Sequence, residues 1–539
     1  MTSLPSRPDL GQLKRQAKEL LAGYRNGDAE AVARFAAALP AARHTPDIAL
    51  REMAFRLHDA QSCLAREYGF ASWADLRGYV EVVARLGTDP DAMTDSFLGT
   101  VYAGEIAGGN SRARPATAAR LLAEHGDQIA DDPLIACATG DVEAVRRQIE
   151  AEPGWIDRAG GRLNLTPLIA ACQSSLVLLP EYHTGLVRTV AALLEAGADP
   201  NRRLSRSWQV NADMPADTWE VSALHGAAGV YFDPEITRLL IAAGADPNDG
   251  ESLYHSLDNP VCTPLLLEAG AWVEGTNALF RALDFDDLDT FQRLVDHAGD
   301  SNELRNGRLI LWAIRRRRSP AHIRALLAAG ADPKVKNKAG VSAHVAALRY
   351  GLPEVADLLA EAGGATPSTI EDRFVAACAR ADADMAQEIL NERPGLPASL
   401  DQDRLRLLPE LAEAGARDAV KLMVDLGWPL DVKGGDWNAS ALNQAVFRGD
   451  AELARYLLER GSVWTERHGF GDNVCGTLSW ASVNEPHAEG DWPGCASALL
   501  DHGMPGATRD PEMPGAVLVG GERRRFSDAV TDTLLGADR

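Results

Sequence analysis

One hydrophobic phrase recurs along the chain: a pair of leucines, two or three further residues, and a glycine. Its clearest copy is RALLAAGADP at 324–333, and the other copies lie at 193–201, 239–248, 266–271, 358–363 and 457–461. Each copy predicts a helix that ends at the glycine, because glycine adopts the left-handed conformation that caps a helix C-terminus. The Asp-Pro that follows the best copies favours a turn. Six copies with the same side-chain order predict an internal repeat.

The first 90 residues lack this phrase but carry helical spacing. Leu10, Leu13, Ala17, Leu20 and Leu21 share one face of a predicted helix, with Asp9 as its N-cap. Further helices are predicted at 29–39 and 50–68, and a short one begins at Ser72. We expect Phe70 and Trp73 to belong to the local core. Helices near 94–107 and 116–125 would link this segment to the repeats.

From Asp132 onward a fuller repeat pattern appears. A first helix opens with Pro, Thr-Pro or a Ser, a turn such as Gly140-Asp141 follows, and a second helix ends in the leucine-glycine phrase. Further openings lie at 165–171, 222–228, 277–279 and 340–347. After Gly364 a second block opens at 374–382, 407–415, 440–450 and 477–481. The pattern predicts stacked helix-turn-helix units.

The motifs Thr166-Pro167-Leu168, Ala223-Leu224-His225 and the leucine-glycine phrase resemble the ankyrin repeat. The spacing agrees, since Gly330 and Gly363 are 33 residues apart and the ankyrin period is about 33. The resemblance covers roughly 132–504. The run at 64–76 resembles the helical leader found ahead of ankyrin arrays in many bacterial proteins. Together they imply an all-α ankyrin-repeat solenoid of stacked helix-turn-helix units, preceded by a small helical domain.

The expected domain organisation follows from these patterns. An N-terminal helical domain spans 1–90, a helical linker or cap 91–131, a first repeat block 132–364, a second ankyrin-like block 365–505, and a C-terminal cap or tail 506–539. The tail carries an amphipathic stretch at 526–535. We expect it to cover the last repeat, because the end of an array otherwise exposes its apolar face.

Composition and charge narrow the choice of partners. The formal net charge is −23, and lysine occurs only seven times. Such a chain repels phosphate backbones, so nucleic acid is a poor general partner. The seven scattered cysteines form no CxxC pair, and most lie in apolar surroundings. Unpaired buried thiols, with no signal peptide and no apolar run long enough to cross a membrane, predict a cytoplasmic protein without membrane attachment.

Catalytic motifs are missing from the sequence. There is no phosphate-binding P-loop, no HExxH and no GxSxG. In the ankyrin pattern the histidine at the position of His225 and His344 bonds to a neighbouring turn, which implies a structural role. The acidic stretch at 284–289 lacks the spacing of a calcium loop and is expected to cap a helix. No catalytic residue, metal site or cofactor is predicted.

The sharpest charge feature is the run Arg315, Arg316, Arg317 and Arg318. Two interpretations stay open. The run either holds an acidic peptide, a phosphate or nucleic acid, or it is a solvated helix end, where the helix dipole favours arginine.

Long inserted loops are the second candidate for binding. The segment 202–220 carries Trp208, Met214 and Trp219, the turn at 181–184 carries Tyr182, and the last repeat carries Trp492. Insertions in repeat proteins often lie on the binding face, and Trp and Tyr are common interface anchors. The alternative is that these loops fold back and bury their own aromatic rings.

The sequence therefore predicts a monomeric, non-catalytic scaffold that binds a protein partner through the concave face and turn tips of the array. Its predicted partner-binding residues are Tyr182, Trp208, Trp219, Arg315, Arg316, Arg317, Arg318 and Trp492. Two alternatives stay open. One is an enzyme with a site in 1–130 or in the irregular C-terminal block, for which Glu181, His183 or His468 would have to converge. The other is nucleic-acid binding through Arg315–Arg318.

Overall fold

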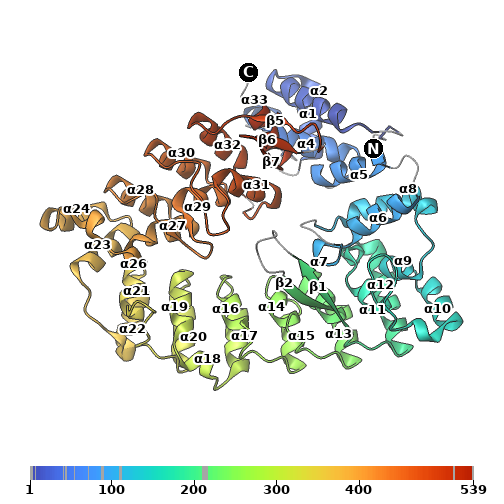
Figure 1. Cartoon of the computed structure of the whole chain (residues 1–539), viewed down its shortest axis with the longest axis horizontal. Coiled ribbons are helices and arrows are strands. Elements are labelled where there is room, and N and C mark those ends of the chain that lie inside the picture. The colour runs from blue at the N-terminus through green and yellow to red at the C-terminus, as the bar shows by residue number, and fades with distance from the viewer. Residues whose placement is uncertain are drawn as a thin grey trace. The chain divides into compact units, whose positions relative to one another are not determined.

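The computed structural model is built almost entirely of helices (Figure 1). It describes residues 4–536 except 6–7, 40–41, 43–44, 54, 71, 86–89, 108–111, 209–216, 488 and 514–515. The chain divides into two compact units, Met1–Ala278 (unit 1) and Leu279–Arg539 (unit 2). No helix of the described part is both long enough and apolar enough to cross a membrane.

Unit 1 begins with helices that lack the repeat phrase. They are α1 (Leu10–Arg25), α2 (Ala29–Ala38), α3 (Asp47–Glu52), α4 (Leu57–Glu67), α5 (Trp73–Arg85), α6 (Pro90–Val101), α7 (Gly104–Ala107), α8 (Pro115–His125) and η2 (Gly126–Gln128). As predicted, Asp9 caps α1 by accepting the amide of Gln12. Phe70 and Trp73 are buried, which confirms their place in the local core.

The repeats of unit 1 follow. Their elements are α9 (Pro133–Thr139), α10 (Val142–Ala151), η3 (Pro153–Trp155), α11 (Pro167–Cys172), η4 (Ser175–Leu178), α12 (Pro180–Glu195), β1 (Arg203–Trp208), β2 (Asp217–Ser222), η5 (His225–Val230), α13 (Pro234–Ala242), α14 (Ser252–Ser256) and α15 (Thr263–Glu268). First helices pack on first helices, as α9 does on α11, and second helices on second helices, as α10 does on α12. The inserted segment is an antiparallel hairpin in which Arg203 pairs with Ser222 and Trp208 with Asp217.

Unit 2 continues the array. Its elements are α16 (Ala278–Ala282), α17 (Leu288–Ala298), α18 (Asn302–Arg305), α19 (Arg308–Arg315), α20 (Pro320–Ala328), α21 (Ala343–Arg349), α22 (Pro353–Leu359), η6 (Ala360–Gly364), α23 (Ile370–Ala379), α24 (Ala383–Glu392), α25 (Leu396–Ser399), α26 (Gln402–Leu405), α27 (Leu407–Glu413), α28 (Arg417–Asp425), β3 (Lys433–Gly434), β4 (Ala439–Ser440), α29 (Ala441–Arg448), α30 (Ala451–Glu459), α31 (Val474–Asn484), α32 (Trp492–Asp501), β5 (Ala507–Arg509), β6 (Val517–Val519), β7 (Glu522–Arg524) and α33 (Asp528–Gly536). The expected fold class, an all-α solenoid of stacked helix-turn-helix units preceded by a small helical domain, is confirmed.

The leucine-glycine phrase ends its helices as the sequence predicts. The six glycines are left-handed, with φ between 87° and 108°, and they are Gly197, Gly244, Gly270, Gly330, Gly363 and Gly461. At the clearest copy, the amide of Ala331 returns to the carbonyl of Leu326 at 3.0 Å. This bond uses one of the carbonyls that a helix end leaves without a partner. The phrase is therefore the point at which each packed second helix turns out into an exposed tip.

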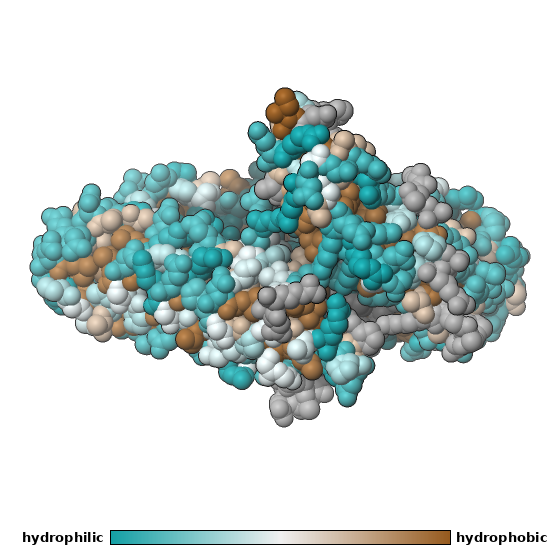
Figure 2. Space-filling view, turned by 90° about the horizontal axis from the view of Figure 1, so that it is seen from above, coloured by the Kyte–Doolittle hydropathy of each residue, from teal (hydrophilic) through white to brown (hydrophobic). Residues whose placement is uncertain are grey.

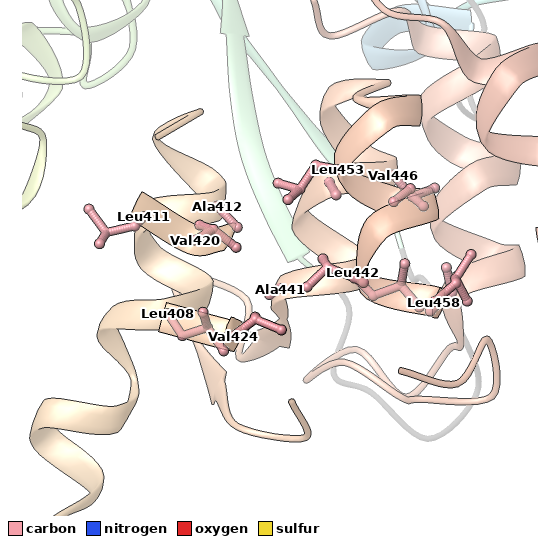
Figure 3. Close-up of a cluster of buried hydrophobic side chains, with 14 of the residues drawn as sticks. Leu408, Leu411, Ala412, Val420, Val424, Ala441, Leu442, Val446, Leu453 and Leu458 are labelled. Carbon is pink, nitrogen blue, oxygen red and sulfur yellow. The ribbon is translucent and has the colours of Figure 1, made fainter. Parts of the chain in front are cut away.

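One hydrophobic cluster runs through the second half of unit 2, from Phe374 to Leu534. Figure 3 shows part of it, where Leu408 of α27 lies near Val424 of α28. Small residues such as Ala412 and Ala441 are fully buried between these helices, which lets the helices approach closely. By contrast, the surface seen in Figure 2 is mostly hydrophilic, with scattered hydrophobic patches.

The C-terminal segment closes this cluster with a sheet that the sequence pattern did not predict. β5, β6 and β7 form an antiparallel three-stranded sheet, and α33 packs on α32. Val517, Phe526 and Leu534 bury their side chains in the cluster. Arg524 of β7 forms an ion pair with Asp472, in the hairpin before α31. The segment thus covers apolar surface of the last helix pair.

The two repeat-opening histidines behave differently. His344 follows the expected pattern, since its Nδ1 accepts the Thr366 amide of the next turn at 3.5 Å. His225 does not, because its Nδ1 has no hydrogen-bond partner among the described residues. Its ring packs instead on His255, with the ring centroids 5.1 Å apart. Burial and, secondarily, the nearby His255 lower the pKa of His225 to about 4.

This lowered pKa predicts acid sensitivity in unit 1. Unfolded histidine titrates near ~6.5, so the unfolded state binds the proton more readily than folded His225 does. Stability is then highest above that pH, and the free energy of unfolding falls as the pH drops from about 6.5 towards about 4. His225→Asn should flatten this slope in urea titrations across the range. An unchanged slope would show that protonation of His225 does not cause the acid sensitivity.

Candidate functional site

A groove lies on the first-helix face of unit 2. It has a volume of about 610 Å³ and is formed by α16, α19, α21, α23, α26, α27 and the turn tip that precedes α21. The first helices stand next to one another because the second helices pack behind them, as α19 does beside α21 and α20 beside α22. The side chains that face away from the core thereby become one continuous surface. All of its lining residues belong to unit 2.

The groove is strongly basic although the chain is strongly acidic. Its lining contains seven cationic side chains against two acidic ones, Asp403 and Glu410. The cationic residues are Arg308, Arg315, Lys336, Lys338, Arg349, Arg404 and Arg406. In a chain of formal net charge −23, such a concentration creates a local field that attracts anions.

Three of the seven cations are neutralised inside the protein. Arg349 bonds to Asp372 and Asp403, each at 2.8 Å, and Arg404 pairs with Asp372 at 2.8 Å. Arg406 bonds to Glu410, also at 2.8 Å. Because Asp372 and Glu410 are buried, these pairs are largely shielded from solvent. They form a rigid wall of the groove rather than a free binding surface.

Arg315 lines the groove and is held by the carboxylate of Asp436. Its Nη2 lies 2.7 Å from Asp436, close enough for an ion pair, although the angle is too poor for a hydrogen bond. Its guanidinium lies 5.4 Å from the ring of Trp312. The attraction between the two opposite charges depends on their distance, and at this distance it supports an ion pair. Arg315 therefore adds positive charge to the groove while keeping a partner.

The remaining three cations, Arg308, Lys336 and Lys338, are exposed and have no carboxylate partner among the described residues. Lys336 and Lys338 stand two residues apart on the tip before α21. Arg308 begins α19, with its guanidinium 5.9 Å from the Phe280 ring. These three side chains can pair with an incoming anion without breaking an existing ion pair.

Between the cations lies an apolar floor. The rings of Phe280 and Trp312 meet edge to face, with centroids 5.9 Å apart. The Trp312 indole donates to the carbonyl of Phe280 at 3.1 Å, which fixes the ring. Leu311 and Val341 complete the floor, and both are half-buried. An apolar side chain of a ligand would find a preformed surface here.

Tyr350 marks the inner end of the groove. Its hydroxyl donates to the buried carboxylate of Glu410, which Arg406 also holds. Burial, and then the Glu410 charge, raises the pKa of Tyr350 well above its usual value. The phenol stays neutral and remains a hydrogen-bond donor. It acts as a fixed structural group rather than as a base.

Two of the groups named for a possible enzyme, His183 and His468, have structural contacts within their own units. His183 bonds to Asp233 at 2.6 Å, and the same carboxylate caps α13 by accepting the amides of Glu235 and Ile236. His468 belongs to unit 2, where its ring packs edge-on against Trp437. Within the described part of the chain no group of three His, Cys, Asp or Glu side chains is placed to hold a metal ion. All seven cysteines are free and buried, as the sequence predicts.

The four consecutive arginines are bound within unit 2. Arg316 bridges Asp284 at 2.7 Å and Asp436 at 2.6 Å, and Arg318 lies 3.4 Å from Asp286. Arg317 donates to the carbonyl of Tyr350. The acidic stretch at 284–289 thus supplies counter-charges, and its Asp287 caps α17 as expected. Of the four, only Arg315 lines the groove.

The predicted aromatic anchors have separate environments. Trp492 is 6 % exposed and belongs to the hydrophobic cluster of unit 2, which favours a loop that buries its own ring. Tyr182 and Trp219 are half-buried in unit 1. Trp208 ends β1, while Met214 lies outside the described residues. Their role in partner binding stays a prediction.

The sequence reasoning missed the three unpaired cations. A signal for two of them was present, because Lys334, Lys336 and Lys338 are three of only seven lysines and lie within five residues. They follow the clearest leucine-glycine phrase, at a turn tip. Arg308 had no comparable signal, since one arginine at a helix start is unremarkable among many arginines.

No family model matches the chain, and no curated protein matches it. Among solved structures it is similar to the ankyrin repeat domain of human ASB11, at 19 % identity and TM-score 0.21, over 42 % of this chain and 98 % of that one. It is also similar to the ankyrin repeat domain of Bcl-3, described as a unique member of the IkappaB protein family, at 23 % identity and TM-score 0.18, over 37 % and 92 %.

Proposed function

We propose that the chain is a non-catalytic scaffold that binds a protein partner along the first-helix face and turn tips of unit 2. The observation that supports this is the basic groove, in which Arg308, Lys336 and Lys338 stand unpaired beside an apolar floor. A stacked array presents such a surface already formed, so little conformational entropy is lost on binding. Catalysis would need an available nucleophile, base or metal at the groove, whereas its two carboxylates are already held, Asp403 by Arg349 and Glu410 by Arg406 and Tyr350.

A charge reversal on the tip tests this function. Lys336→Glu combined with Lys338→Glu should reduce capture of a specific partner from native extract by about tenfold, because two attractions become repulsions. Both lysines are exposed and unpaired, so the fold should be unaffected. The measurement is quantitative affinity capture with the full chain, followed by binding of the purified partner.

The chain offers a matched control for this experiment. Lys334→Glu changes charge on the same tip at an exposed residue outside the groove lining. It should leave capture nearly unchanged. Equal losses for Lys334→Glu and the double variant would show that net charge, not the groove, controls binding. Retention of every partner by the double variant would place the binding surface elsewhere, for example on the hairpin that carries Trp208 and Trp219.

A further inference from the structure

The groove combines two kinds of surface that are separated in space. Its rim carries the unpaired Arg308, Lys336 and Lys338, and its floor carries Phe280, Trp312, Leu311 and Val341. We propose that the groove recognises an extended acidic segment of a protein, in which two carboxylates and one large apolar side chain stand on successive alternate residues and so face the same side. This deepens the proposed scaffold function and rests on it.

The place where an anionic ligand binds follows from which cations are unpaired. The wall pairs Arg349–Asp372, Arg404–Asp372 and Arg406–Glu410 are already formed and would have to be broken to bind an anion. The rim cations lose only hydration and side-chain freedom. An anionic ligand therefore binds at the rim, and the wall keeps the rim cations in place by fixing α21 against α23 and α26.

The spacing of Lys336 and Lys338 favours a ligand with separate carboxylates over a ligand with one concentrated charge. Lys336 and Lys338 are two ammonium groups on alternate residues, each a point charge. Side chains on alternate residues of an extended peptide point to the same side, about 6.6 Å apart. Two carboxylates spaced in this way can each meet one lysine. A single phosphate is usually gripped by the fork of an arginine, and only Arg308 is free on this rim.

The apolar floor would bind the large apolar side chain of the ligand. Trp312 is fixed by its hydrogen bond to the Phe280 carbonyl, and the two rings form an edge-to-face pair. A leucine or aromatic side chain placed on this floor would be removed from water between fixed rings and the aliphatic Leu311 and Val341. Interfaces of this type draw most of their affinity from one such central anchor. The surrounding charges orient the segment and raise the rate of association.

Nucleic acid fits the same groove poorly. A polyanion longer than the groove would extend over the remaining surface of a chain whose net charge is −23. The four consecutive arginines give it no second site, since Arg316 and Arg318 are paired with aspartates and Arg317 with a carbonyl. A short acidic peptide gains the local attraction without this long-range repulsion.

The test is fluorescence anisotropy of the full chain with synthetic labelled peptides. The probe has the pattern Glu-x-Glu-x-Leu, which places both carboxylates and the leucine on one side of an extended peptide, and saturable binding that weakens with added salt is expected. Lys336→Glu with Lys338→Glu should weaken it about tenfold, and Lys334→Glu should leave it unchanged. Leu311→Ser should weaken binding of this probe but not of a probe in which the leucine is replaced by serine.

Several outcomes would overturn the proposal. Tighter binding of a phosphoserine peptide or of single-stranded nucleic acid would assign the rim to phosphate. Equal binding of the probes with and without leucine would remove the apolar anchor. Absence of saturable probe binding, while partner capture still depends on Lys336 and Lys338, would reject the acidic segment and leave the scaffold function standing. Unchanged thermal unfolding of each variant rules out misfolding as the cause.

Discussion

Replacing Asp372 by alanine is expected to lower the free energy of unfolding of unit 2 by about 3–5 kcal/mol. Asp372 is 3 % exposed and accepts from Arg349 at 2.8 Å, from Arg404 at 3.0 Å and from the Thr369 amide at 2.9 Å. Its removal leaves two shielded guanidinium groups with less counter-charge and deprives α23 of its capping box. The large cost arises from the charges left behind, since the intact pair itself contributes modestly.

Urea titration of the full chain, followed by a signal from unit 2, measures this effect. The control is Asp300→Ala, because Asp300 pairs with Arg305 at the surface and both side chains are mostly exposed. It should change stability by less than about 1 kcal/mol. Similar losses for the two variants would contradict the view that burial makes the Asp372 cluster important.

The same cluster has a defined pH dependence. Burial alone raises the pKa of Asp372, but the Thr369 amide and the Arg349 charge outweigh it, and the net pKa is lowered. A carboxyl whose pKa is lower when folded stabilises the fold above its unfolded pKa of ~3.9, and this contribution is lost as the pH falls through the folded value. Asp372→Ala should therefore show less acid destabilisation than the wild type.

The second large effect is expected at Gly449, where two inter-helix turns meet. Gly449 ends α29 with φ +70°, and its carbonyl accepts the amide of Asp491 at 2.8 Å. A Cβ at this position would lie 2.5 Å from the Cα of Gly490 and 2.8 Å from the Asp491 nitrogen. Gly449→Ala should cost about 2–4 kcal/mol, from left-handed strain plus the displacement of the neighbouring turn.

Gly330→Ala is the matched comparison. Gly330 is also left-handed, with φ +87°, but a Cβ there meets nothing within 4 Å. Only the strain remains, so the expected loss is about 1 kcal/mol. Denaturant unfolding of both variants distinguishes the two contributions. Equal losses would mean that the turn after α31 yields to the added methyl group without cost.

Gly449 and Gly330 show which features of the fold can be predicted from the sequence and which cannot. The sequence marks Gly330 as a helix-ending glycine and places Gly449 only at the end of a repeat opening, and both are left-handed in the structure. Nothing in the sequence shows that Gly449 is crowded and Gly330 open, because the crowding comes from Gly490 in the following repeat unit. Local backbone preference is set by neighbours in the chain, whereas close approach is set by how the units stack.

In the candidate site, too, some features are visible in the sequence and others appear only in the fold. The sequence drew attention to Arg315–Arg318 because a run of like charges is visible in one dimension. In the fold, Arg316 is neutralised by Asp436, which lies 120 residues further along the chain. Lys336 and Lys338 are visible in the sequence only as part of a lysine cluster, and the stacking of α19 beside α21 places them with Arg308 around one groove.

The sequence by itself therefore determined the repeat, the ends of its helices, the buried cysteines and the all-α class. These depend on hydrophobic periodicity and on the conformational range of glycine, which are local properties. Only the tertiary structure decided which charges are paired, which tips are crowded and where a groove forms. Pairing and burial depend on residues from different repeats that become neighbours when the helices stack, and no spacing along the chain records those distances.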